Sequence, residues 1–271
     1  FANRPNAVEA LPLALAEHQR FAGVLNKVAK VVEFQDLLTD ILKIDSVKKE
    51  VLEQLCKLYE CPEVFTDLYA LEPTKLSHQL LEGTPMHKDT LEKYLNPLHY
   101  AIPPLPNAFF TRDATMCVHN KVIVGSMAYR VRVAESLLLR AIFKHHPDIQ
   151  NDGFYFDSAA NKDKQITIEG GDLLVIRHDL ILIGYSERTT AAGIDRLMES
   201  LADDGEDRPF IVVEIPKQRA TIHLDMIFTM VDRDKCVVFP PLITGSNACR
   251  AIHIRYQNRK VASIEEYSGL L

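Results

Sequence analysis

The segment ATIHLDMIF, residues 220–228, combines apolar side chains with two residues that can carry or accept protons, His223 and Asp225. It contains β-branched residues and neither Pro nor Gly, so we expect a β-strand. Side chains two positions apart on a strand point to the same face, which would bring His223 and Asp225 together. An imidazole beside a carboxylate on a rigid element suits acid–base catalysis. The alternative interpretation is an amphipathic strand with one solvated face.

Composition narrows the class of protein. The chain has 271 residues, of which 47% are hydrophobic, enough for one large domain or a domain with an insertion. Its net charge of -6 argues against general nucleic-acid binding, which usually needs a basic balance. No run of 18 apolar residues occurs, so we expect no membrane span and no membrane partner.

The cysteines indicate a reducing compartment. They are five, widely scattered and without a C-x-x-C pair, so the sequence predicts neither a disulfide framework nor a zinc site. We therefore expect a cytoplasmic protein. In the apolar contexts of Cys117 and Cys236 we expect small buried side chains.

Apolar periodicity predicts helices that alternate with short strands. The helices are expected at residues 7–29, 36–44, 129–146 and 190–201. The strands are expected at residues 28–34, 118–124 (a hairpin), 166–169, 173–176, 180–183, 210–215 and 236–239. Hairpins followed by single helices predict an α/β fold built from ββαβ units.

Residues 46–95 keep helical spacing almost throughout, broken by the Cys61-Pro62 and Glu72-Pro73 pairs. We interpret them as a helical insertion subdomain. Residues 1–45 and 96–271 would then form the α/β domain.

Three further segments place charged groups beside predicted strands. A segment stiffened by prolines, residues 101–107, precedes FTRD, residues 110–113, which ends at Asp113. In EGGD, residues 169–172, two glycines allow φ > 0 and the close approach of a ligand. In GYSERTT, residues 184–190, Arg188 could hold a carboxylate with two hydrogen bonds. Each segment also has a simpler interpretation: a solvated aspartate, a tight turn and a helix N-cap.

Together these groups indicate a site that handles arginine. Carboxylates in pairs suit a guanidinium ion, because its planar donors fork onto acceptors. Separate cations suit the carboxylate of an amino acid. The residues in question are Asp113, Glu169, Asp225, His223, Arg132 and Arg188.

Four motifs in this order resemble the arginine deiminases among the guanidino-group-modifying enzymes. They are LPNAFFTRD (105–113), EGGD (169–172), GYSERT (184–189) and HLDMIFTMVD (223–232). The resemblance runs from about residue 4 to at least residue 243 and includes the helical insertion. It implies a five-bladed α/β propeller (pentein fold), L-arginine as substrate, and neither metal nor cofactor. The oligomeric state stays open, a homodimer or larger oligomer included.

The resemblance also implies roles for individual residues. Asp113 and Asp225 would hold the substrate guanidinium, and Glu169 and His223 would form the acid–base pair. The other expected substrate contacts are Asn107, Phe110, Arg132, Asp172 and Arg188.

One departure from the family concerns the nucleophile. Arginine deiminases attack the guanidinium carbon with a cysteine in a Gly-rich motif near the C-terminus, and these 271 residues contain no such motif. The context of Cys249, SNACR, does not match it. We therefore expect a fragment with exposed apolar surface near residues 240–271, inactive by itself.

Two alternatives to an arginine deiminase stay open. One is another guanidino-modifying enzyme: an agmatine deiminase, a dimethylargininase or an amidinotransferase. Arg132 and Arg188 argue against agmatine, which has no carboxylate to bind. The other is a non-catalytic arginine-binding fragment.

Overall fold

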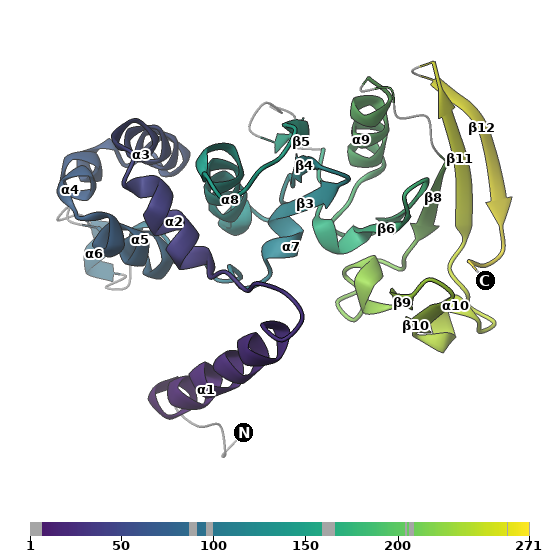
Figure 1. Ribbon diagram of the computed structural model, residues 1–271, viewed down its shortest axis with the longest axis horizontal. Coiled ribbons are helices and arrows are strands. Elements are labelled where there is room, and N and C mark those ends of the chain that lie inside the picture. The colour runs from purple at the N-terminus through teal and green to yellow at the C-terminus, as the bar shows by residue number, and fades with distance from the viewer. Residues whose placement is uncertain are drawn as a thin grey trace.

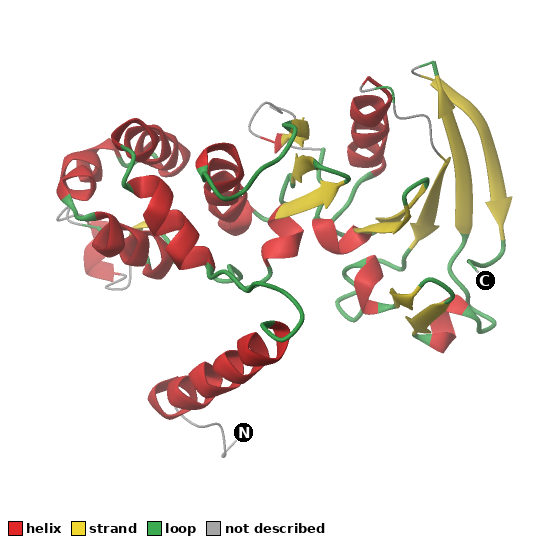
Figure 2. Cartoon of the chain, in the orientation of Figure 1, coloured by secondary structure: helices red, strands yellow, loops and turns green. Residues whose placement is uncertain are grey.

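The computed structural model describes residues 7–86, 91–95, 100–158, 166–203, 205, 209–258 and 260–270. Figure 1 shows a helical region at one end of the molecule and mixed sheets with their helices at the other, with α1 (Ala7–Leu25) projecting from the body. The same division is visible by element type in Figure 2. Within the described residues, no helix is long and apolar enough to cross a membrane.

The helical region follows the apolar spacing of the sequence. It comprises α2 (Phe34–Leu42), α3 (Asp45–Tyr59), η1 (Pro62–Val64), α4 (Phe65–Ala70), α5 (Pro73–Glu82) and α6 (Leu91–Leu95). A two-stranded ribbon, β1 (Thr84–Pro85) with β2 (Tyr100–Ile102), connects it to the sheets. Val47, Val51 and Leu55 form the buried stripe of α3 and share one core with Leu138 and Ile142 of α8. The predicted insertion is thus helical and packs on the α/β part. Its status as a separate subdomain stays a prediction.

The first ββαβ unit lies in the middle of the chain. It consists of β3 (Thr115–Val118), β4 (Lys121–Val124), α8 (Val133–His145) and β5 (Phe154–Asp157). β3 and β4 pair antiparallel, as the predicted hairpin requires, and β5 pairs parallel with β4. The helical turn α7 (Thr111–Ala114) precedes β3, and the 3-10 turn η2 (Arg130–Arg132) precedes α8.

The second unit repeats this order. The 3-10 turn η4 (Gly170–Asp172) precedes β6 (Leu173–Arg177) and β7 (Leu180–Tyr185), which pair antiparallel. After α9 (Ala191–Asp203), β8 (Pro209–Glu214) returns parallel to β7. The structure therefore confirms an α/β architecture with two ββαβ units.

The C-terminal part adds two hairpins. The turn η5 (Leu224–Met226) leads into β9 (Phe228–Asp232) and β10 (Lys235–Val238), followed by α10 (Pro240–Ile243). β11 (Ala251–Gln257) and β12 (Lys260–Tyr267) extend the sheet of the second unit, in the order β12-β11-β8-β7-β6. Val261 and Ile264 on β12 are exposed apolar side chains, while the expected contiguous apolar surface in this region stays a prediction.

The strand predicted at 220–228 is wrong for most of its length. His223 is extended, but residues 224–226 form a 3-10 turn and the strand begins at Phe228. A 3-10 helix has three residues per turn, so Leu224 and Ile227 face the core together while Met226 is 51% exposed. His223 and Asp225 therefore do not share a strand face.

Three other expectations need correction. Residues 28–34 form no strand, and Val28 and Val32 there are exposed. Residues 166–169 hold only an isolated bridge between Ile168 and Ser126. Cys117 is exposed and Cys236 half-buried, so neither is the fully buried side chain expected. A strand needs a hydrogen-bonding neighbour, which composition alone does not supply.

Candidate active site

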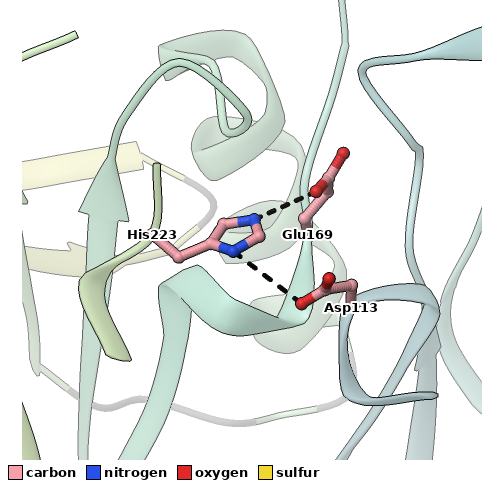
Figure 3. A group of neighbouring side chains, drawn as sticks. All are labelled: Asp113, Glu169 and His223. Atoms are coloured by element: carbon pink, nitrogen blue, oxygen red, sulfur yellow. Dashed lines mark hydrogen bonds and ion pairs between the residues drawn. The ribbon is translucent and has the colours of Figure 1, made fainter. Parts of the chain in front are cut away.

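Three side chains from distant parts of the chain meet in a buried cluster (Figure 3). Nε2 of His223 lies 3.0 Å from Oε2 of Glu169, to which it donates a hydrogen bond, and Nδ1 lies 3.9 Å from Oδ1 of Asp113. Glu169 is 0% exposed, and the other two are below a tenth. Each of the three lies in or directly before a short helical turn, α7, η4 or η5.

The two glycines of EGGD make this approach possible. A Cβ on Gly171 would lie 2.6 Å from Cγ of His223, and one on Gly170 would lie 1.9 Å from the carbonyl oxygen of Arg112. The expectation of φ > 0 is wrong here, because Gly83, Gly153 and Gly205 are the described glycines with positive φ. What the EGGD turn needs from glycine is the missing side chain.

The acidic surroundings favour the protonated form of His223. Burial acts to lower the pKa of His223, but the hydrogen bond to Glu169 and the charges of Asp172 and Asp113 outweigh it and raise the pKa above its ordinary value. An imidazolium that contacts a carboxylate can donate a proton and take it back.

Arg132 ties the cluster to helix α8. Its Nη1 donates to Oδ2 of Asp113 at 2.7 Å, and its Nε and Nη2 donate to Oε2 of Glu135 at 3.0 and 2.8 Å. Nη1 also lies 3.7 Å from Oε2 of Glu169. Sequence reasoning missed Glu135. The signal was its position three residues after an arginine at the start of a helix, where side chains are neighbours.

Arg188 approaches Glu169 from the second unit. Its Nη1 lies 3.8 Å from Oε2 of Glu169, and its guanidinium stacks on the ring of Tyr129, 4.2 Å from the centroid. The buried Nε of Arg188 has no hydrogen-bond partner among the described residues. Tyr129 was also missed. It donates to Oε1 of Glu187 and is half-exposed at the site.

Asp225 lies within electrostatic range of the cluster. Burial raises the pKa of Asp225, the charge of His223 lowers it and the charge of Asp113 raises it, with a net increase. The structure thus brings Asp225 towards Asp113 and His223, through the η5 turn rather than through a shared strand face.

The remaining predicted substrate contacts occupy different settings. Asp172 is fully buried, and protein donors occupy both of its oxygens. The carbonyl oxygens of Asn107 and Phe110 lie 3.5 Å from Nη2 of Arg132. The ring of Phe110 is half-exposed and lies against that of Phe109, with centroids 4.0 Å apart and the ring planes tilted by 39°.

The cluster could also supply metal ligands. Asp113, Glu169 and His223 each offer one ligand atom, all within 4.8 Å of one another. Arg132 and Arg188, however, place positive groups within 4 Å of Glu169. Their charges repel a divalent metal ion more strongly than a monovalent guanidinium, whose planar donors also match carboxylates.

No cysteine belongs to this group in the part of the chain that the structure describes. Cys249 is 4% exposed in an apolar core, and burial raises the pKa of its thiol. Burial and the neighbouring Cys56 raise the pKa of Cys61 to about 12. A nucleophilic thiol needs a lowered pKa, so these settings do not suit one.

The cluster is a buried imidazole–carboxylate pair surrounded by arginines and aspartates in an α/β fold of ββαβ units, an arrangement that can transfer protons. Sequence comparison supplies the family. The chain belongs to the arginine deiminase family, whose model matches residues 6–269.

Two relatives illustrate the extent of this match. Arginine deiminase of Limosilactobacillus reuteri is 32% identical over 96% of this chain and 66% of its own length. Arginine deiminase of Mycobacterium bovis is 33% identical over 84% of this chain and 59% of its own. The chain therefore spans less than two thirds of the length of these relatives.

Among solved structures, two dimethylarginine dimethylaminohydrolase chains are similar to this one. One, from Pseudomonas aeruginosa and complexed with citrulline, is 20% identical, with a TM-score of 0.39 over 59% of this chain and 65% of that chain. The other is 21% identical, with a TM-score of 0.38 over 51% of each chain.

Proposed function

We propose that this chain forms the arginine-binding and acid–base part of an arginine deiminase, which hydrolyses L-arginine to L-citrulline and ammonia. The observation that carries the proposal is the His223–Glu169 hydrogen bond, buried beside Asp113 in a chain of this family. Within the proposal, Asp113 and Asp225 hold the guanidinium. The complete enzyme has the pentein propeller fold and acts in the cytoplasm.

The chemistry needs a thiolate besides these residues. The thiolate attacks the guanidinium carbon, and His223 gives its proton to the departing nitrogen, so that ammonia leaves and a covalent thiouronium remains. Water then attacks the same carbon and loses a proton to His223, and the carbon–sulfur bond breaks. The sum is arginine plus water giving citrulline plus ammonia. Glu169 holds the imidazole in place for both proton transfers.

Arg188 favours L-arginine over substrates that lack the α-carboxylate. Arg188 has a buried donor without a partner, so a carboxylate placed there would satisfy it. Agmatine lacks that carboxylate. Arg132 is already paired with Asp113 and Glu135, which makes Arg188 the better partner for the substrate's α-carboxylate.

The second candidate function is non-catalytic arginine binding, which the settings of the buried cysteines favour for residues 1–271 alone. Isothermal titration with L-arginine and a citrulline assay distinguish the two. We expect L-arginine to bind to this polypeptide without release of citrulline, and citrulline to form when the polypeptide is extended by the Gly-rich cysteine motif of an arginine deiminase. Asp113→Asn should abolish binding, whereas Asp179→Asn, on an exposed turn, should not change it. Absence of binding to the unsubstituted chain would contradict the proposal.

A further inference from the structure

Asp172 is enclosed by the protein on every side. Its Oδ2 accepts a hydrogen bond from Oγ of Ser186 at 2.6 Å, and its Oδ1 accepts one from the backbone N–H of Leu224 at 3.0 Å. The carboxylate fits only because residue 184 is glycine: a Cβ there would lie 2.3 Å from Oδ1. Since Asp172 is 0% exposed, a substrate could not reach it without displacing these donors.

The same contacts fix His223. Leu224 directly follows His223, so the bond from its N–H to Asp172 holds the backbone on one side of the imidazole. Gly171, directly before Asp172, packs against the ring itself. The Gly-Gly-Asp turn therefore holds both the ring and the main chain of the residue that donates to Glu169.

Ser186 is in turn held in one orientation. The backbone N–H groups of Arg188 and Thr189 donate to its Oγ at 2.9 and 3.2 Å, so its own hydrogen points at Asp172. This arrangement connects the loop that carries Arg188 to the loop that carries His223.

We propose that Asp172, oriented by Ser186, is a positioning residue for His223 and not a substrate contact. Its significance for catalysis rests on the proposed function, but the positioning itself does not. The charge of Asp172 also affects the titration of His223, because ionised Asp172 helps to raise the pKa of the imidazole. Burial in turn raises the pKa of Asp172 to about 7.

The test follows the imidazole of His223 directly. The histidines are labelled with 13C and titrated by NMR, and His223→Gln identifies the signal of His223. Asp172→Asn keeps an acceptor for the Leu224 N–H but removes the charge. Asp172→Ala removes both, and Ser186→Ala removes only the hydroxyl. Asp179→Asn, an exposed carboxylate paired with Arg177, is the matched control. Circular dichroism checks the fold of each variant.

Positioning predicts a graded result. In Asp172→Asn the titration midpoint of His223 moves to lower pH. In Ser186→Ala it moves the same way by less, because Asp172 without that hydrogen bond is more often protonated. In Asp172→Ala the His223 signal also shifts or broadens as the ring loses its fixed place, and in Asp179→Asn nothing changes.

The proposal fails if the His223 midpoint is unchanged in Asp172→Asn and Ser186→Ala while both remain folded. If those variants also lose binding of L-arginine, Asp172 is a substrate contact instead. A parent chain that binds no L-arginine refutes the proposed function, but the His223 titration still decides the positioning role. Should Asp172→Asn not fold, Ser186→Ala carries the test.

Discussion

The two ββαβ units place a carboxylate and an arginine at matching positions, but the two arginines differ in how fully they are paired with carboxylates. In the first, Asp113 precedes β3 and Arg132 lies between β4 and α8; in the second, Glu169 precedes β6 and Arg188 lies between β7 and α9. Each unit thus contributes a carboxylate before its hairpin and an arginine after it. Loops at equivalent ends of such units converge, which explains how residues far apart in sequence share one cluster.

The difference lies in the arginines. Arg132 is 3% exposed and makes close ion pairs with both Asp113 and Glu135. Arg188 has an aromatic ring beneath it, one carboxylate at 3.8 Å and a donor without a partner. The first arginine is therefore part of the framework, whereas the second keeps a donor that is unpaired among the described residues, as its proposed contact with the substrate requires. The predictions below test this contrast, beginning with the largest effect.

Replacing each arginine by methionine should separate stability from recognition. Arg132→Met leaves two buried carboxylates without a cation, which should cost about 3–5 kcal/mol of unfolding free energy. Arg188→Met should cost about 1 kcal/mol but remove the preference for L-arginine over agmatine. Urea unfolding and titration calorimetry measure the two effects. Equal losses of stability would show that the units do not differ in this way.

The EGGD turn offers a second comparison, between a crowded glycine and an open one. Gly171→Ala should destabilise the protein by about 1–3 kcal/mol, since its methyl group would overlap the His223 ring. Gly23→Ala, in helix α1 with no atom within 4 Å of its Cβ, should be neutral or stabilise by up to about 1 kcal/mol. Thermal unfolding of both variants measures the two changes in stability. A neutral Gly171→Ala would mean that the ring does not pack there.

Stability should also depend on pH through Asp172 and His223. Between about pH 4 and 7, folded Asp172, whose pKa is raised to about 7, keeps a proton that the unfolded chain has lost, so its contribution falls as the pH rises. The contribution of His223, whose pKa is also raised, is complete below its unfolded value and is lost as the pH rises through its folded value. We expect unfolding free energy to decrease from about pH 4 to 7 through Asp172, and to keep decreasing above the ordinary pKa of histidine through His223, by at most about 1.4 kcal/mol per pH unit for each group.

Asp172→Asn serves as the internal comparison for this pH dependence. It should flatten the decrease, because the side chain that releases the proton is gone. Urea unfolding at several pH values measures both slopes. A slope in the variant that matches the parent chain would assign the dependence to other groups.

The smallest effect concerns the ring beneath Arg188. Tyr129→Leu should weaken binding of L-arginine roughly two- to fivefold, because it removes the aromatic face that orients the guanidinium of Arg188. Tyr129→Phe keeps the face and loses only the bond to Glu187, so it should bind almost as well as the parent chain. Equal losses in the two variants would assign the effect to the hydroxyl.

Sequence predicted hairpins followed by single helices, because both depend on local periodicity, but it missed β5, the last strand of the first unit. It also identified Asp113, Glu169 and His223, which the structure brings together. Sequence reasoning failed where a neighbouring strand decides whether a segment forms a strand. Residues 28–34 have strand composition without a neighbouring strand among the described residues.

Long-range contacts were equally invisible to sequence reasoning. β11 was overlooked although it lies beside β8 in the sheet, since no pattern in one strand reveals the other. The enclosure of Asp172 depends on Gly184, Ser186 and Leu224, whose contacts only the fold creates.

The most direct test of the site is whether L-arginine reaches His223. In the labelled chain we expect the His223 signal to move in a saturable way on addition of L-arginine. L-lysine, which has the same charge and carboxylate but no planar guanidinium, should leave it in place. A His223 signal that ignores L-arginine at millimolar concentration, or that responds equally to both amino acids, would contradict the assignment of this cluster as a guanidinium site.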